Sequence, residues 1–313
     1  MVNADLSGQQ SAREKIAAQQ SSVRRADLRK RALIAVGSVV VVIAVVVGFV
    51  VFKSLGKPSS GNPPTGPGAA SSVSSTAASV TRAIASVPAA TLDKVGAGVA
   101  YPATGSVYPH AVQTVTPAAT PLTSGGKPEI VYVGAEYCPY CAAERWALAV
   151  ALSRFGTFSG LRLIHSSSTD VYPNTPTISF YQASYASRYL VFTTTEAETV
   201  SDAPLQPLTA LDRALMTKYD APPYVPSSTY SRSFPFVDFA NRYVIVGASY
   251  APTLLAGLSW QQVAADLTDP GSPAGAAIDA AANRITAAIC KATGGKPGGV
   301  CTSSAVTSVS GSI

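Results

Sequence analysis

The chain has 313 residues, of which 47% are hydrophobic, so it is long enough for one large or two small domains. Its formal net charge is +6, but seven basic and three acidic side chains fall within residues 1–31, and Lys53 and Lys57 add two more positive charges. The remaining 256 residues hold 14 basic and 14 acidic side chains. This balance argues against a nucleic-acid-binding protein, because such a surface needs a basic excess on the folded part.

The N-terminal region predicts a membrane anchor. Residues 1–31 are polar and basic, and the 21 residues from Ala32 to Phe52 carry no charge. At ~1.5 Å per residue, a helix of this length spans the ~30 Å hydrocarbon core of a bilayer. A cleaved signal peptide, with an apolar run of ~7–15 residues and a small-residue cleavage site, is the less favoured alternative. The basic excess before the span predicts a cytoplasmic N-terminus and an extracytoplasmic globular part, in a single-pass protein of the cell membrane.

The segments that follow are expected to be a linker and an extension of the folded domain. Residues 53–70 are rich in Pro, Gly and Ser, which is typical of a linker. Residues 71–126 form the extension, with an amphipathic helix from Ser71 to Val87 and a short turn of helix near Leu92. The main domain is expected at 127–301, with an insertion at 167–230 and a C-terminal helix, and 302–313 is expected to be a loose tail.

A buried strand followed by two closely spaced cysteines is the central feature. Ile130, Val131, Tyr132 and Val133 predict a buried strand, and Cys138-Pro139-Tyr140-Cys141 opens a helical pattern. Two residues between cysteines in a first helical turn bring the sulfurs close enough to bond, and the helix N-terminus stabilises a thiolate on the first. We therefore expect Cys138 to attack and Cys141 to resolve. A zinc half-site or a purely structural pair would leave this strand–turn–helix context unexplained.

The later elements suggest a mixed α/β domain. A strand at Leu161–His165 follows the cysteine helix, and the β-α-β order predicts that it pairs with the first strand in parallel, through a right-handed crossover. Strand-like runs at 177–181 and 189–195 come next, and then a helix from Leu208 to Tyr219. Residues 233–247 predict a hairpin around Ala240–Arg242. Ser259 and Gln262 form a capping-box pattern, and a final helix runs from Ser272-Pro273 to Gly294.

This order of elements resembles the thioredoxin fold, a central mixed sheet flanked by helices, over about residues 127–268. The phrase Phe234-Pro235-Phe236-Val237-Asp238-Phe239 is similar to the cis-proline loop and third strand of that superfamily. The resemblance implies that Pro235 is cis and lies beside the cysteines, and that Phe234 pairs with a substrate backbone. Pro139-Tyr140 is the dipeptide familiar from glutaredoxins. The anchor makes the chain more similar to membrane-tethered extracytoplasmic members.

A narrower resemblance rests on Cys138-Pro-Tyr-Cys-Ala-Ala-Glu-Arg-Trp and on the cysteines near the C-terminus. These features look like the family named domain of unknown function 929.

Two positions depart from the thioredoxin pattern. Tyr132 stands where thioredoxins usually carry a buried acid, and Tyr137 stands where many have tryptophan. Tyr137, with Phe234, is expected to contact substrate. Glu144, one helical turn after Cys141, is the nearest substitute acid, or alternatively a solvated carboxylate beside Arg145.

The remaining cysteines and histidines suggest structural roles. Cys290 and Cys301 would close a 12-residue loop as a disulfide, which an extracytoplasmic location permits; a redox relay to Cys138 and Cys141 is the alternative. His110 and His165 have no metal-ligand spacing, so no metal site and no organic cofactor are expected.

The sequence therefore predicts a membrane-anchored thiol–disulfide oxidoreductase that acts on thiols and disulfides of exported proteins, with a membrane redox partner and no nucleic acid. Its direction, as oxidase, isomerase or reductase, is left open. One alternative is a thioredoxin-like binding or scaffold module with a structural cysteine pair. Another is a dedicated reductant for one client.

Overall fold

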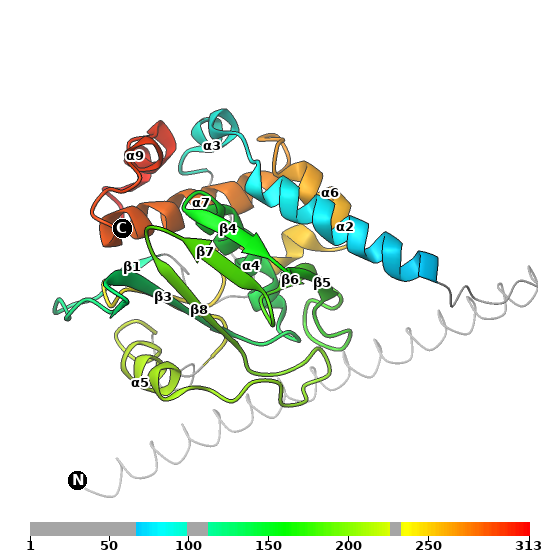
Figure 1. The fold of residues 1–313 in the computed structure, drawn as a ribbon, viewed down its shortest axis with the longest axis horizontal. Coiled ribbons are helices and arrows are strands. Elements are labelled where there is room, and N and C mark those ends of the chain that lie inside the picture. Colours follow the sequence, from blue (N-terminus) through cyan, green and yellow to red (C-terminus); the bar gives the residue numbers. More distant parts are fainter. Residues whose placement is uncertain (1–66, 99–111, 226–232) are drawn as a thin grey trace, which may run out of the picture. The chain divides into compact units, whose positions relative to one another are not determined.

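The computed structural model describes residues 67–98, 112–225 and 233–313 (Figure 1). The predicted basic tail and the Ala32–Phe52 span lie outside the described residues. Among the described helices, none is both long and apolar enough to cross a membrane.

The described chain is a mixed α/β structure. Its helices are α2 (Pro67–Ala85), α3 (Ala89–Val95), α4 (Pro139–Ser153), α5 (Ala210–Tyr219), α6 (Trp260–Asp266), α7 (Pro273–Ala292), α8 (Gly298–Cys301) and α9 (Ser304–Val309), with a 3₁₀ turn η2 (Pro252–Leu255). Its strands are β1 (Gln113–Thr114), β2 (Thr123–Ser124), β3 (Lys127–Gly134), β4 (Gly156–Ser159), β5 (Arg162–His165), β6 (Pro176–Ser179), β7 (Ser184–Ser187), β8 (Val191–Glu196), β9 (Phe236–Phe239) and β10 (Tyr243–Val246).

The central sheet is built around β3. Its strand order is β1-β10-β9-β3-β2, and β8 also pairs with β3. The β3–β8 pair is parallel, with Gly134 opposite Glu196, whereas the other pairs are antiparallel. The predicted hairpin is confirmed: Phe239 pairs with Tyr243, so β9 and β10 join through Ala240–Arg242, and Ala240 and Asn241 both have φ near +60°.

The two faces of this sheet bury different cores because side chains alternate along a strand. Ile130 and Tyr132 point into the larger core, which also contains residues of α2, α4 and α7. Val131 and Val133 point into a smaller core that contains Leu215 and other residues of α5. Figure 1 shows α5 on the opposite side of the sheet from α2 and α7. Helix α4, which carries the cysteines, is therefore buried between the sheet and other helices.

The prediction that Leu161–His165 pairs in parallel with β3 is wrong. Residues 162–165 form β5, which pairs antiparallel with β6 in a separate two-stranded sheet, and β4 pairs with β7 in another. These small sheets lie on α4, where Thr177 Oγ1 and Tyr185 Oη donate hydrogen bonds to the carbonyl oxygens of Ala142 and Leu152. Polar contacts of this kind leave no hydrophobic periodicity. The true partner, β8, lies inside the segment 167–230 that the sequence suggested was an insertion.

Two boundaries also differ from the prediction. Helix α2 begins at Pro67, inside the predicted linker, since proline is tolerated in a first helical turn. The predicted loose tail contains α9, whose Val306 and Val309 are 1% and 0% exposed. The serines and threonines of this tail concealed an apolar pair three residues apart, which is enough to dock a short helix.

Candidate dithiol site

The two cysteines lie where β3 passes into α4. Cys138 is the N-cap residue of α4, and its Sγ accepts a hydrogen bond from the backbone N–H of Cys141 at 3.3 Å. Pro139 occupies the first helical position, where its missing N–H costs nothing. The sulfur of Cys138 thus takes the place that a serine or aspartate oxygen has at many helix starts. A thiolate there would face the positive end of the helix dipole.

Both thiols are unpaired and differ in exposure. Cys138 is 6% exposed and Cys141 is fully buried, and both pack with Ala135. Three partly buried aromatic side chains border this cluster: Tyr137, Tyr140 and Phe234. Cys138 is therefore the sulfur that an incoming group would reach first.

The loop before β9 lies against the first cysteine. The Sγ of Cys138 is 3.7 Å from the carbonyl oxygen of Phe234, and the Phe234–Pro235 peptide bond is cis. Pro235 is buried, and its carbonyl oxygen accepts a hydrogen bond from Gly247 N–H at 2.8 Å. The structure thus brings Phe234 and Pro235, which are about 95 residues downstream of the cysteines in sequence, to the site.

The pKa values of the two thiols are shifted in opposite directions. Burial alone would raise the pKa of Cys138, but hydrogen bonds from Cys141 and the charge of Arg145 outweigh it, and the pKa of Cys138 is lowered. Burial and the hydrogen bond with Cys138 raise the pKa of Cys141 well above its usual value. A nucleophile and a resolving thiol need this asymmetry, because only the thiolate attacks.

Glu144 is not the solvated carboxylate considered as an alternative, and its part as a substitute acid stays a prediction. It is fully buried rather than solvated, and its carboxylate accepts hydrogen bonds from the backbone N–H and hydroxyl of Ser249, at 2.7 and 3.1 Å. Burial raises the pKa of Glu144 to about 7, and the bonds from Ser249 oppose that rise. Arg145 is paired elsewhere, so the expected surface pair of Glu144 and Arg145 is wrong.

Tyr132 lies in the buried floor beneath the cysteines. It is fully buried, and its hydroxyl has no hydrogen-bond partner. Burial raises the pKa of Tyr132 well above its usual value, so the side chain is neutral and cannot replace a carboxylate at neutral pH. A Cβ on Gly134 would come within 2.1 Å of the Tyr132 Oη, so the tyrosine requires glycine at the end of β3.

The charges of a buried ion pair, which the sequence did not predict, act on the thiols. Arg145 Nε and Nη2 donate to the two carboxylate oxygens of Glu196, at 2.8 and 2.6 Å, and both side chains are fully buried. The position of Arg145, four residues after Cys141, places both on one helix face and was a usable signal. Glu196 carried no such signal, because it comes from β8.

A polar cleft borders the residues that lead into Cys138. Its volume is about 660 Å³, and it is lined mainly by hydroxyl-bearing and polar residues of 164–169, Asn174 and 200–202. Ser167 N–H donates to the Tyr137 carbonyl at 2.8 Å, and Glu136 N–H donates to the Glu198 carbonyl at 2.9 Å. These two bonds connect both sides of the cleft to the turn that precedes Cys138. Tyr140 packs edge to face against Tyr172, with ring centroids 5.7 Å apart.

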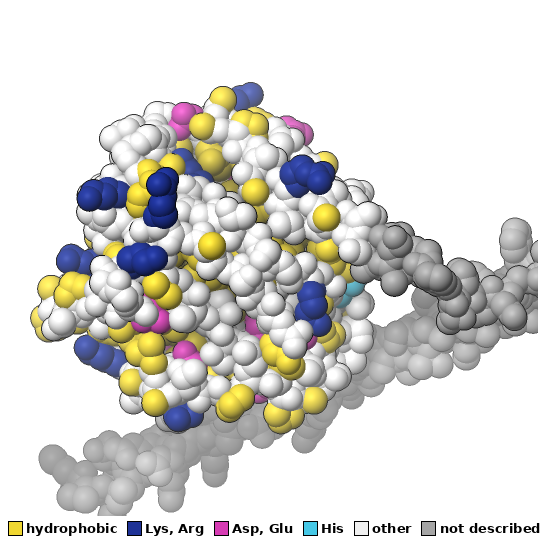
Figure 2. Space-filling view, viewed as in Figure 1, with side chains coloured by type: hydrophobic (Ala, Val, Ile, Leu, Met, Phe, Trp, Pro, Cys, Tyr) yellow, Lys and Arg dark blue, Asp and Glu magenta, His cyan; other side chains and the backbone are white. Residues whose placement is uncertain are grey.

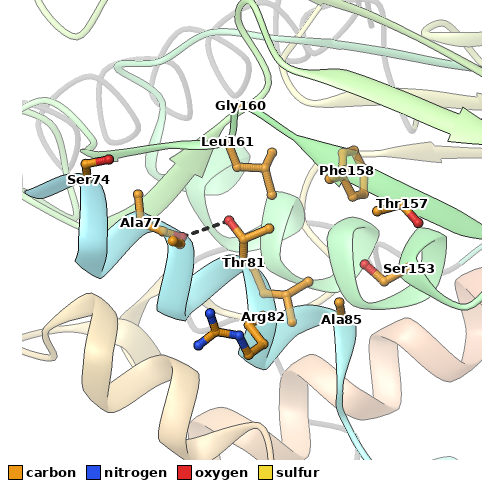
Figure 3. A pocket seen from close by; sticks show the side chains of 12 residues that line it. Ser74, Ala77, Thr81, Arg82, Ala85, Ser153, Thr157, Phe158, Gly160 and Leu161 are labelled. Atoms are coloured by element: carbon orange, nitrogen blue, oxygen red, sulfur yellow. Dashed lines mark hydrogen bonds between the residues drawn. The ribbon is translucent and has the colours of Figure 1, made fainter.

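A second cavity, of about 430 Å³, lies between α2 and the β4 region (Figure 3). Thr81, Phe158 and Leu161 are among its lining residues, and the Thr81 hydroxyl is satisfied by the Ala77 carbonyl. The dithiol residues are not among those that line it. On the face in Figure 2, basic side chains are dispersed over mostly uncharged surface.

The other predicted residues lie apart from the dithiol. Cys290 and Cys301 form a disulfide between the end of α7 and α8. The ring of His165 packs on Trp260, with centroids 4.3 Å apart, and His110 lies outside the described residues. Within the described ranges, no group of three or more His, Cys, Asp or Glu side chains could hold a metal ion.

A mixed α/β domain with a buried dithiol at a strand–helix junction is thus the class that the fold and the site define. A family model described as a domain of unknown function, DUF929, matches residues 113–291, and the chain belongs to this family. Searches of curated proteins and of solved structures found no match.

Proposed function

We propose that this protein is a thiol–disulfide oxidoreductase with a thioredoxin-like fold, in which Cys138 attacks and Cys141 resolves. One observation carries the proposal: the Cys138 sulfur caps α4 and accepts the Cys141 N–H at 3.3 Å. This arrangement stabilises negative charge on the more exposed of two neighbouring thiols. The apposition of Phe234 to Cys138 supports the thioredoxin-like part of the proposal.

The chemistry follows in two balanced steps. The Cys138 thiolate attacks one sulfur of a substrate disulfide, that S–S bond breaks, and one substrate thiolate leaves as the mixed disulfide forms. Cys141 then loses its proton and attacks Cys138 Sγ, which releases the second substrate thiolate and leaves Cys138–Cys141 oxidised. The substrate gains two electrons. The same steps in reverse oxidise a substrate dithiol.

The surroundings of the pair provide places for a polypeptide substrate. The Phe234 backbone lies next to Cys138, and the partly buried Tyr137 and Tyr140 border the cluster, with the polar cleft beside Tyr137. We propose that an extended segment of an exported protein lies across these groups. The sequence of residues 1–52 supports an anchored protein whose domain faces away from the cytoplasm.

A second candidate, a binding module with a structural cysteine pair, is favoured by the low exposure of Cys138, 6%. The two are separated by the reduction potential of Cys138–Cys141 in the full-length chain, equilibrated in glutathione or dithiothreitol buffers. A value near ~−120 mV would make the protein a disulfide donor, and one near ~−270 mV a reductase. A cysteine pair that stays oxidised in every buffer would refute the proposed enzymatic function and favour the binding module.

Trapping provides a complementary test. A Cys141→Ser variant should accumulate mixed disulfides with exported proteins through Cys138, because the resolving thiol is gone. Cys138→Ser is the matched control and should accumulate none. Equal trapping by both variants would contradict the assigned roles.

A further inference from the structure

Arg145 is held in one orientation beneath the dithiol. It follows Cys141 by four residues on α4, and its Nε and Nη2 form a two-pronged ion pair with Glu196 at the end of β8. Both side chains are fully buried. Since the guanidinium is planar and its fork matches a carboxylate, this pair fixes the position of the positive charge.

The guanidinium is linked directly to the backbone of the first cysteine. Arg145 Nη2 also donates to the carbonyl oxygen of Ala135 at 2.7 Å, and that same oxygen accepts the N–H of Cys138 at 3.3 Å. Arg145 and Cys138 therefore share one acceptor. Ala135 also packs against the two cysteines, so the positive charge lies close to the sulfurs in a buried cluster.

One nitrogen of Arg145 is left over. Its Nη1 is buried and has no hydrogen-bond partner, and the same holds for the hydroxyl of Tyr132, whose ring centroid is 6.0 Å from Arg145 Cζ. A buried ion pair is a poor source of stability, because well-packed apolar residues often do as well. A buried arginine with a spare donor beside two thiols therefore suggests a role in their chemistry.

The other ionisable groups around the pair are neutral or acidic. Tyr132 on β3 lies below the thiols, Tyr137 and Tyr140 border them, and the charges of Glu198 and Asp202 act on Tyr137. Carboxylates oppose a thiolate, whereas Arg145 favours one.

We propose that Arg145 is the positioning residue of the dithiol: held by Glu196 and Ala135, its charge stabilises the thiolate of Cys138 and then, in the mixed disulfide, the thiolate of Cys141. The stabilisation of the Cys141 thiolate in the mixed disulfide rests on the proposed function, whereas the stabilisation of the Cys138 thiolate does not. Glu196 orients the guanidinium and partly offsets its charge.

The test measures the rate of alkylation of Cys138 by iodoacetamide against pH. It uses the full-length chain with Cys141→Ser, in which the Cys290–Cys301 disulfide leaves Cys138 as the one free thiol. Circular dichroism checks that each variant folds. Glu196→Gln keeps the size of the side chain and one of the two oxygens that accept from Arg145, but removes the negative charge, and should move the midpoint of the profile to lower pH. Arg145→Met with Glu196→Gln removes both charges without leaving either unpaired, and should move the midpoint to higher pH. If the midpoint rises by about one pH unit, this double variant should react about tenfold more slowly than the Cys141→Ser parent at one pH unit below the parent's midpoint.

The matched control is Arg162→Met, which breaks the pair of the half-exposed Arg162 with the buried Glu136 beside the same turn and should leave the midpoint in place. Opposite shifts in the two test variants support the proposal. A midpoint in Glu196→Gln that stays fixed or rises overturns it, whether or not the double variant folds. If the shifts occur but the wild-type protein exchanges with no disulfide, including the small neutral hydroxyethyl disulfide, the role of Arg145 stands and the proposed function fails.

Discussion

Replacing Glu144 by glutamine is expected to change the pH dependence of stability. The carboxyl is fully buried, and burial raises the pKa of Glu144 to about 7, against ~4.3 in an unfolded chain. Between these values the native state keeps a proton that the unfolded state has lost. Raising the pH through this range therefore lowers the free energy of unfolding by up to ~1.4 kcal/mol per pH unit, and by about 3 kcal/mol between pH 4.5 and pH 8. Above pH 7 both states are ionised and the loss is complete.

Glutamine has no such proton, so the stability of the wild-type protein relative to Glu144→Gln should fall by about 3 kcal/mol between pH 4.5 and pH 8. Urea unfolding of the full-length chain at several pH values measures this difference. Asp202→Asn is the control, because Asp202 is exposed and its left-handed backbone, with φ of 60°, suits asparagine equally well. Parallel stability curves for wild type and Glu144→Gln would refute the burial argument. A change in the alkylation profile of Cys138 would show that Glu144 acts on the thiols after all.

Two further predictions concern the C-terminal part of the chain. Cys290→Ser with Cys301→Ser should lower the free energy of unfolding by about 3 kcal/mol, the loop-entropy value for 12 residues, while the reduction potential of Cys138–Cys141 stays unchanged; a changed potential would instead support a relay between the pairs. Val309→Ala should cost about 2 kcal/mol in urea unfolding, because Val309 is fully buried by the docking of α9. Val171→Ala, at a residue that is 69% exposed, is its control, and equal effects would mean that α9 is not docked.

The elements that the sequence predicted well are those set by neighbouring residues. The helix that opens at the cysteines, the capping box of Ser259 and Gln262, and the hairpin turn around Ala240–Arg242 each depend on contacts within a few residues. Local patterns of this kind need no knowledge of the tertiary fold.

The failures arose where a distant segment decides the outcome. Leu161–His165 is a more hydrophobic strand than Val191–Glu196, yet the second pairs with β3. β8 has threonines at 193–195, and Thr195 is satisfied by a hydrogen bond from its hydroxyl to Asp212 on α5. The hydrophobic pattern of a strand predicts how deeply it is buried. It does not show which buried polar side chains will find hydrogen-bond partners on another element.

The misplaced strand also explains why the charge at the site was missed. Because β3 and β8 are parallel, both end at the same edge of the sheet, and that edge is where β3 delivers the turn into Cys138. Gly134 and Glu196 are partners in register, so the carboxylate reaches the floor of the site only if β8 is the neighbour of β3. With β5 in that place, Arg145 would have no buried partner and would be expected at the surface. The strand order therefore decides whether this dithiol has a cation beneath it.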